Sequence, residues 1–444
     1  MSQTPGPTTA GPAAPAPHGL PPALRGWLAA LGTALAGLVT MVVTAALGLW
    51  AAGAADLPQG GYPAVVAAAV VAAAGGSISA TGDAGIIAEA RAAVDAVPLS
   101  VTLAGMLVTA VLFLRPLRHR AVAPAGELLG RIARTAVCWV VLLWLVALAA
   151  RHSFTVTVGN SLADQLGALL GSTPTVGFHA DLPATVGYGL LWVLAVLVLA
   201  FLVSRRAPLD ARLLRFQDAV RPPAHAMLLV LLAYVAIGLL VGVVELFTRG
   251  DPARTLAVLL LGLPNLAWLA LGLGTGGAWS GHVDKVLGLP LPHALEQVLR
   301  HRGTHTVDLG SLGAQDGRVW LLVAVAAVVL LGAAFGAAVR APARIPLWRH
   351  ALEMAAALAL TLLVVGLLTR IDAHYGLSLI GVGDLGGDLG GAVLLEPQLW
   401  RLVGVGAAWG LVTGCAGGLA ARRVRHPGQV GDAPHAPPHA PPDR

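Results

Sequence analysis

The sequence predicts an all-α, polytopic membrane protein with about eight membrane-spanning helices in two tandem four-helix repeats. Three observations support this class. The chain is 57% hydrophobic and 11% charged, whereas a soluble domain has about 25% charged residues. Several charge-free apolar runs reach the ~20 residues that cross a bilayer. Landmarks of the first half also recur in the second half.

The repeat is defined by proline, glycine, aspartate and arginine positions. Four landmarks recur 201 positions later, so that Pro63, Gly75, Gly76 and Asp83 correspond to Pro264, Gly276, Gly277 and Asp284. Further along, the spacing is 219 for Arg151 and Arg370, and 217 for Arg205–Arg206 and Arg422–Arg423. Repetition on this scale indicates a duplicated bundle. The wider spacing predicts an insertion in the second copy, within residues 285–318.

Eight apolar stretches are predicted to span the membrane: residues 27–51, 98–114, 132–150, 185–204, 225–247, 319–339, 351–369 and 400–420. At a rise of 1.5 Å per residue, twenty helical residues cover the ~30 Å hydrocarbon layer. Residues 1–24 and 424–444 are rich in proline, the latter also in histidine, and both are predicted to be disordered tails. The two membrane repeats then occupy residues 25–222 and 223–423.

Two further apolar segments, 62–78 and 255–277, are predicted to be re-entrant or interfacial. The first begins at Tyr62-Pro63, and its apolar stretch is too short to span a bilayer. The second is broken by Pro264-Asn265 and ends in closely spaced glycines.

Arginine placement orients the chain. Basic clusters occupy residues 115–134, 205–221, 340–349 and 422–425, and the positive-inside rule places all four in the cytoplasm. An even number of crossings then separates them, which requires that the two interrupted segments do not cross completely. Five crossings per half with an inverted second half is the less favoured alternative. We expect a plasma-membrane protein with both termini cytoplasmic and a pseudo-twofold axis along the membrane normal.

The interrupted segments are also the candidate functional site. Paired broken helices at matching positions of two halves indicate a site between the halves. The candidate residues are Tyr62, Pro63, Gly75, Gly76, Ser77 and Asp83 from the first half, and Pro264, Asn265, Gly276, Gly277, Ser280 and Asp284 from the second. The alternative is that these segments only close the outer mouth of the bundle as folded loops.

Two sets of glycines at i+4 spacing are predicted to serve helix packing: Gly332 and Gly336, and Gly406, Gly410, Gly414 and Gly418. Small residues at this spacing let helix backbones approach one another in lipid. Packing within the chain is favoured over homodimerisation.

Other site classes find little support in the sequence. No HExxH or Walker A motif is present, and we expect no metal, cofactor or nucleic-acid partner. Cys138 and Cys415 lie in apolar stretches and are predicted to be structural. Glu245 and Glu353 lie near the ends of their helices, which argues against a proton-coupled pump.

Several loops carry a family resemblance. Six segments of the chain resemble those of the streptophobe family: the run Leu49–Pro58, the Gly75-Gly76-Ser77 turn, the loop 82–85, the run Pro98–Gly105, and the segments Phe113–Arg118 and Pro264–Trp268. The resemblance covers nearly the whole chain except its tails. It implies a very hydrophobic actinobacterial membrane protein, and it supplies no catalytic residue.

We expect a non-enzymatic function. The leading hypothesis is a permease-like or channel-like protein with a site between the two repeats. The second is a structural or accessory membrane component whose acidic outer loops bind a partner. The third and least favoured is a membrane lipid-linked transferase. The expected partners are the lipid bilayer and an unknown small molecule or membrane protein.

Overall fold

The computed structural model describes residues 21–57, 60–83, 88–116, 125–155, 175–204, 211–248, 250–283, 305–341, 346–379, 383–384 and 391–424. Helices predominate within these ranges, and eight of them are long and apolar enough to cross a membrane. The predicted helical, polytopic class is thereby confirmed. Nearly all of both predicted tails lies outside the described ranges.

Seven of the long helices match predicted spans: α1 (Pro22–Ala51), α4 (Ala125–Ala149), α6 (Leu182–Val203), α7 (Ala211–Thr248), α11 (Leu321–Arg340), α12 (Leu347–Leu368) and α13 (Leu399–Val424). The eighth long helix is α8 (Pro252–Gly274), which continues through Pro264 where the sequence indicated a break. The predicted span 98–114 forms the shorter helix α3 (Leu99–Leu114), and segment 62–78 contributes the 12-residue helix α2 (Tyr62–Ala73).

The described residues also form a nine-stranded antiparallel sheet, which the sequence analysis did not foresee. Its strands are β1 (Ile78–Asp83), β2 (Ala88–Ala96), β3 (Arg151–Thr155), β4 (Thr175–Ala180), β5 (Trp279–Val283), β6 (His305–Val307), β7 (Ile371–Leu379), β8 (Gly383–Asp384) and β9 (Gly391–Pro397). The main strand order is β3-β4-β1-β2-β7-β9-β5-β6, with β8 paired to β7. The strand β2 reads AEARAAVDA, and such alanine-rich segments carry little strand propensity.

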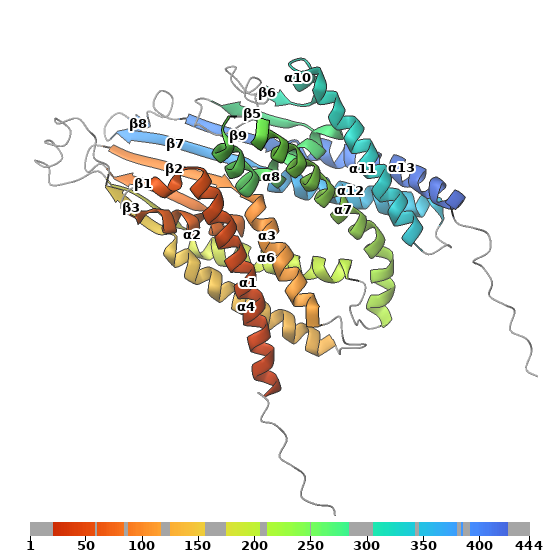
Figure 1. Cartoon of the computed structure of the whole chain (residues 1–444), viewed down its shortest axis with the longest axis horizontal. Coiled ribbons are helices and arrows are strands. Elements are labelled where there is room, and N and C mark those ends of the chain that lie inside the picture. The colour runs from red at the N-terminus through yellow and green to blue at the C-terminus, as the bar shows by residue number, and fades with distance from the viewer. Residues whose placement is uncertain are drawn as a thin grey trace, which may run out of the picture.

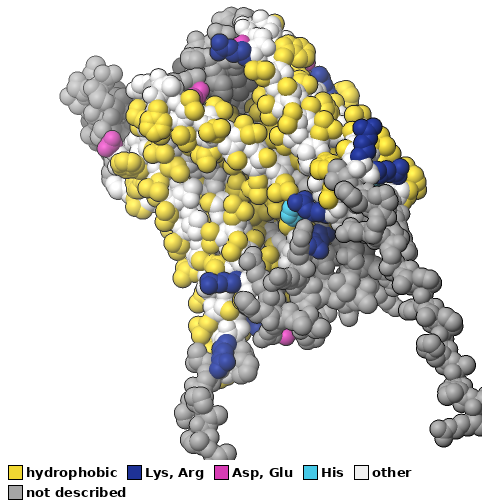
Figure 2. Space-filling model, turned by 45° about the vertical axis from the view of Figure 1, so that its right-hand side comes forward, with side chains coloured by type: hydrophobic (Ala, Val, Ile, Leu, Met, Phe, Trp, Pro, Cys, Tyr) yellow, Lys and Arg dark blue, Asp and Glu magenta, His cyan; other side chains and the backbone are white. Residues whose placement is uncertain are grey.

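Helices and strands occupy different ends of the molecule (Figure 1). Each hairpin follows one helix and precedes another. The strand ends that connect to helices therefore all lie on the same side of the sheet, toward the helices. The helix ends away from the sheet carry basic residues, including Arg25, Arg115, Arg340, Arg422 and Arg423. The described part of one face is broadly apolar (Figure 2).

The two halves share one order of longer helices and strand hairpins. Within the described residues, each half contains five helices of twelve residues or more and two strand hairpins, and the second half adds the five-residue helix α10 (Leu309–Gly313). The strand registers agree between the halves. Ile78 pairs with Ala180, and Trp279, 201 positions after Ile78, pairs with Pro397, 217 positions after Ala180. Likewise His152 pairs with Phe178, and Ile371 with Leu395.

The expected pseudo-twofold axis does not describe the sheet. The order β3-β4-β1-β2 of the first half is followed by β7-β9-β5-β6, which are the corresponding strands in the same order. The halves are therefore joined head to tail, with β2 paired to β7. A twofold axis through an open sheet would instead reverse the order in the second half.

Each half has its own apolar core. Met41, Phe113 and Trp139 belong to the core of the first half, and Trp279 and Leu358 belong to that of the second. Leu99 of α3 is buried in the core of the second half, while Leu261 of α8 packs against the core of the first. The two halves thus exchange side chains at α3 and α8.

Candidate functional site

The predicted site segments end in the same backbone motif. Gly75 follows α2 with a φ of 89°, and Gly276 follows α8 with a φ of 94°. Gly76 N donates to Val71 O at 2.9 Å, and Gly277 N donates to Gly272 O at 2.8 Å. These are Schellman-type caps, in which a left-handed glycine lets the chain turn back onto the last carbonyls. The glycine pairs therefore terminate helices and lead into β1 and β5.

In the first half, this turn packs against α6. A Cβ added at Gly75 would lie 3.3 Å from the Tyr188 Cβ, and one added at Gly76 would lie 2.8 Å from Thr185 Oγ1. Ser77 O accepts a hydrogen bond from Asp181 N at 3.3 Å. The turn is thus held by backbone and apolar contacts to α6.

The remaining first-half residues lie apart from the turn. Tyr62, at the start of α2, donates its hydroxyl hydrogen to Ala46 O of α1 at 2.6 Å. Pro63 occupies the first turn of α2, where a missing N–H costs nothing. Asp83 is at the far end of β1, opposite Glu89 and Thr175 in the strand register.

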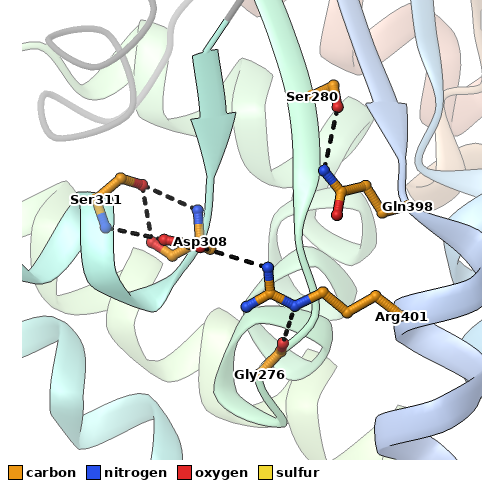
Figure 3. Close-up of polar contacts among 6 residues, drawn as sticks. All are labelled: Gly276, Ser280, Asp308, Ser311, Gln398 and Arg401. Atoms are coloured by element: carbon orange, nitrogen blue, oxygen red, sulfur yellow. Dashed lines mark hydrogen bonds and ion pairs between the residues drawn. The ribbon is translucent and has the colours of Figure 1, made fainter.

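In the second half, the turn after α8 is held by α13 through polar contacts (Figure 3). Arg401 Nε donates to Gly276 O at 3.0 Å. A Cβ on Gly277 would lie 2.5 Å from Leu402 Cδ2. Gln398 Nε2 contacts Ser280 Oγ at 3.4 Å. Asp284 lies outside the described residues.

Arg401 and Asp308 form the centre of a cluster that the sequence analysis missed. The Arg401 guanidinium lies 3.5 Å from Asp308 Oδ2, and Asp308 Oδ1 accepts the backbone N–H of Ser311 at 2.9 Å. This backbone hydrogen bond, together with the charge of Arg401, lowers the pKa of the Asp308 carboxyl. An arginine one residue inside the predicted span 400–420 is a signal that could have indicated the cluster.

Pro264 and Asn265 lie at the seam between the halves. The Asn265 amide accepts Leu99 N at 3.1 Å and donates to Val97 O at 2.9 Å. Ser100 Oγ donates to Leu259 O at 2.9 Å and accepts Leu263 N at 3.1 Å. Leu259 O and Leu263 N are i and i+4 partners of α8, so a hydroxyl from α3 bridges the helix ladder beside the proline. Such side-chain insertion is a known way to accommodate proline within a helix.

The described parts of the predicted site thus occupy separate places. The two glycine turns lie against α6 and α13, Asp83 lies at the far end of a strand, and Asn265 joins the halves. Around Asn265, hydrogen bonds to the backbone of the first half hold the two halves together.

An apolar cavity of about 500 Å³ lies elsewhere between the halves, bordered by α3, α6 and α7. Its apolar lining includes Leu107 and Leu114 of α3, Leu199 and Val203 of α6, and Leu228 of α7. Ser204 adds a hydroxyl to the lining. Its lining suits a hydrocarbon chain and offers no coordination to an ion.

The predicted packing glycines of α13 face α12. A Cβ at Gly410 would lie 2.5 Å from the Ala355 Cα, and Gly406 and Gly414 similarly contact Ala359 and Ala351. On α11, an added Cβ at Gly332 would meet nothing within 4 Å, and one at Gly336 would meet the side chain of Arg340 within its own helix.

Within the part of the chain that the structure describes, no group of three or more His, Cys, Asp or Glu residues could hold a metal ion. A scan against protein-family models matches none, and searches of curated proteins and of solved structures likewise find no match.

Proposed function

We propose that the protein is an accessory membrane component whose strand layer is a docking platform for a partner protein on the outer face of the plasma membrane. The observation that carries the proposal is the sheet to which both halves contribute, at the end of the molecule opposite the basic helix ends. The positive-inside rule orients that sheet outward and both termini toward the cytoplasm.

The seam between the halves supports this choice over a permease for polar solutes. The side chains of Asn265 and Ser100 form hydrogen bonds with backbone groups across the contact between the halves. A polar solute needs a path lined by polar groups, whereas the cavity bordered by α3, α6 and α7 is apolar.

The second candidate function follows from that cavity. A permease-like protein with a lipid-class substrate would use the space between α3, α6 and α7, since hydrocarbon chains match its lining.

Photo-crosslinking in cells tests the platform. Glu396, at the sheet, and Val412, on the exposed face of α13, are each replaced by a photoreactive residue; both side chains are more than half exposed. We expect protein adducts from position 396 and lipid adducts from the control position 412. Asp83→Asn, in the β1–β2 hairpin, is expected to weaken partner recovery while leaving membrane insertion normal.

Proteoliposomes supply the opposing measurement. Protein-dependent release of a trapped polar solute, or the absence of protein adducts from position 396, would refute the platform. Accelerated exchange of a labelled phospholipid, abolished by Ala110→Trp and Ala200→Trp in the cavity lining, would favour the second candidate.

A further inference from the structure

The sheet ends in two outer strands, β3 and β6, at the opposite ends of its strand order (Figure 1). Among the described strands, β3 pairs only with β4, and β6 pairs only with β5. Arg151 and Ser153 of β3 and Thr306 of β6 are exposed. An unpaired edge presents a row of N–H and C=O groups that can pair with another strand.

The joint between the halves shows what each edge fits. There, β2 pairs with β7 along its whole length, from Ala88 opposite Leu379 to Ala96 opposite Ile371. Strand β6 occupies in its half the position that β2 occupies in the first, as the second strand of the first hairpin. Strand β3 corresponds in the same way to β7. Among the described strands, the two outer ones, β6 and β3, are therefore the counterparts of β2 and β7, which the chain already joins internally.

The internal registers set the expected pairing. Ile78 pairs with Val94 and Trp279 with Val307, so Val307 is the counterpart of Val94. Phe154 pairs with Val176 and Ala373 with Val393, so Phe154 is the counterpart of Ala373. Val94 lies opposite Ala373 in the internal joint. A β6–β3 joint of the same kind places Val307 opposite Phe154, and Thr306 opposite Thr155.

We propose that β6 of one copy of this chain pairs with β3 of a second copy, in the register that β2 and β7 adopt within the chain. The edges of one copy lie at opposite sides of the sheet, so a second copy must supply the partner strand. This contact is heterologous, so its repetition makes a ring where the rotation between copies closes and an open array where it does not. On the basis of the proposed platform function, a second copy of the chain is then one partner of the sheet.

The helices are compatible with the same contact. Within the chain, α6 of the first half touches α7 of the second. The corresponding contact between copies joins α13 to α1 of the next copy. Both helices carry exposed apolar side chains, including Leu35, Val39 and Val43 on α1 and Trp400 and Leu411 on α13.

Disulfide trapping tests the pairing in full-length protein carrying Cys138→Ala and Cys415→Ala, since both native cysteines are free thiols. Thr155→Cys and Thr306→Cys are placed in separate copies with tags of different size and co-expressed. Directly opposite residues of an antiparallel pair have Cβ atoms about 4.5–5.5 Å apart, near the reach of a disulfide. We expect a mixed dimer of the two tagged copies, and monomers when either variant is expressed alone.

The matched control pairs Phe154→Cys with Thr306→Cys. Adjacent strand positions point to opposite faces, so this pair is expected to cross-link at least ten-fold less. A chain carrying both Thr155→Cys and Thr306→Cys is expected to form oligomers larger than a dimer.

Three results would overturn the proposal: a disulfide within one chain of the double variant, self-dimers of either single variant, or no cross-link from membrane-inserted, monodisperse protein. If the cysteine pair fails to cross-link but position 396 still gives adducts to a different protein, the self-assembly is refuted and the docking platform still stands. If mixed dimers form but position 396 gives no adduct to a different protein, the self-assembly stands and docking of a different protein is refuted.

Discussion

At the scale of single residues, the two halves are joined by side chains whose roles depend on their partners. Asn265 uses both its amide oxygen and its amide nitrogen on the backbone at Val97 and Leu99. Ser100, from the first half, inserts its hydroxyl into α8 near Pro264, where it bonds to Leu259 O and Leu263 N. Both proline-associated polar residues therefore stabilise the joint.

Removing these groups should loosen the joint. Hydrogen bonds between membrane helices average about 0.6 kcal/mol, with a maximum of about 1.7 kcal/mol, so Ser100→Ala and Asn265→Ala should each destabilise the protein by about 0.5–2 kcal/mol. The control is Thr40→Ala, because the Thr40 hydroxyl donates to Ala36 O of its own helix at 2.8 Å. Thermal unfolding in detergent measures the difference. Equal losses in all three variants would contradict the assignment.

Asp308 should make stability dependent on pH. Its pKa is lowered in the folded protein, so its ionised form stabilises the fold above the ordinary carboxyl pKa of about 3.9. That contribution is lost as pH falls through the lowered value. Asp308→Asn keeps a cap acceptor but not the charge, and the partly exposed pair with Arg401 is worth about 0–1 kcal/mol.

The measurement compares the melting temperatures of the parent protein and Asp308→Asn at pH 7 and at pH values below about 4. We expect the parent to be the more stable at pH 7 and the difference to shrink on acidification. A difference that grows on acidification would show that the carboxylate does not stabilise the fold.

At the scale of elements, α12 and α13 depend on close backbone approach. Gly410 leaves no room for a Cβ beside Ala355. Gly410→Ala should therefore force the helices apart and cost about 1–3 kcal/mol, as overpacking does. Gly404→Ala, on the same helix, would meet nothing within 4 Å and serves as the control. Comparable melting temperatures for the two variants would refute the close-packing role.

At the scale of the whole molecule, the strand layer changes the functional interpretation. From the sequence, the acidic segments between helices are expected to be loops. In the structure, strands within these segments pair into one sheet, which supplies the surface for the proposed platform. The residues of the expected transport site do not come together. They lie at a helix cap in each half, at the end of a strand, and at the contact between the halves. The candidate residues were recognisable from sequence as unusual, but their partners were not.

Sequence alone determined that this chain is a helical, polytopic membrane protein, because bilayer thickness sets the length and hydrophobicity of a spanning helix. It located seven of the eight long helices, since each carries an uninterrupted apolar run. Only the tertiary structure decided that α8 continues through Pro264, because the hydroxyl of Ser100, more than 150 positions earlier, bridges Leu259 O and Leu263 N in the turn before the proline. The sheet was likewise decided in three dimensions. The register of β2 on β7 joins residues nearly 300 positions apart, and no local alternation of side chains encodes such a partner.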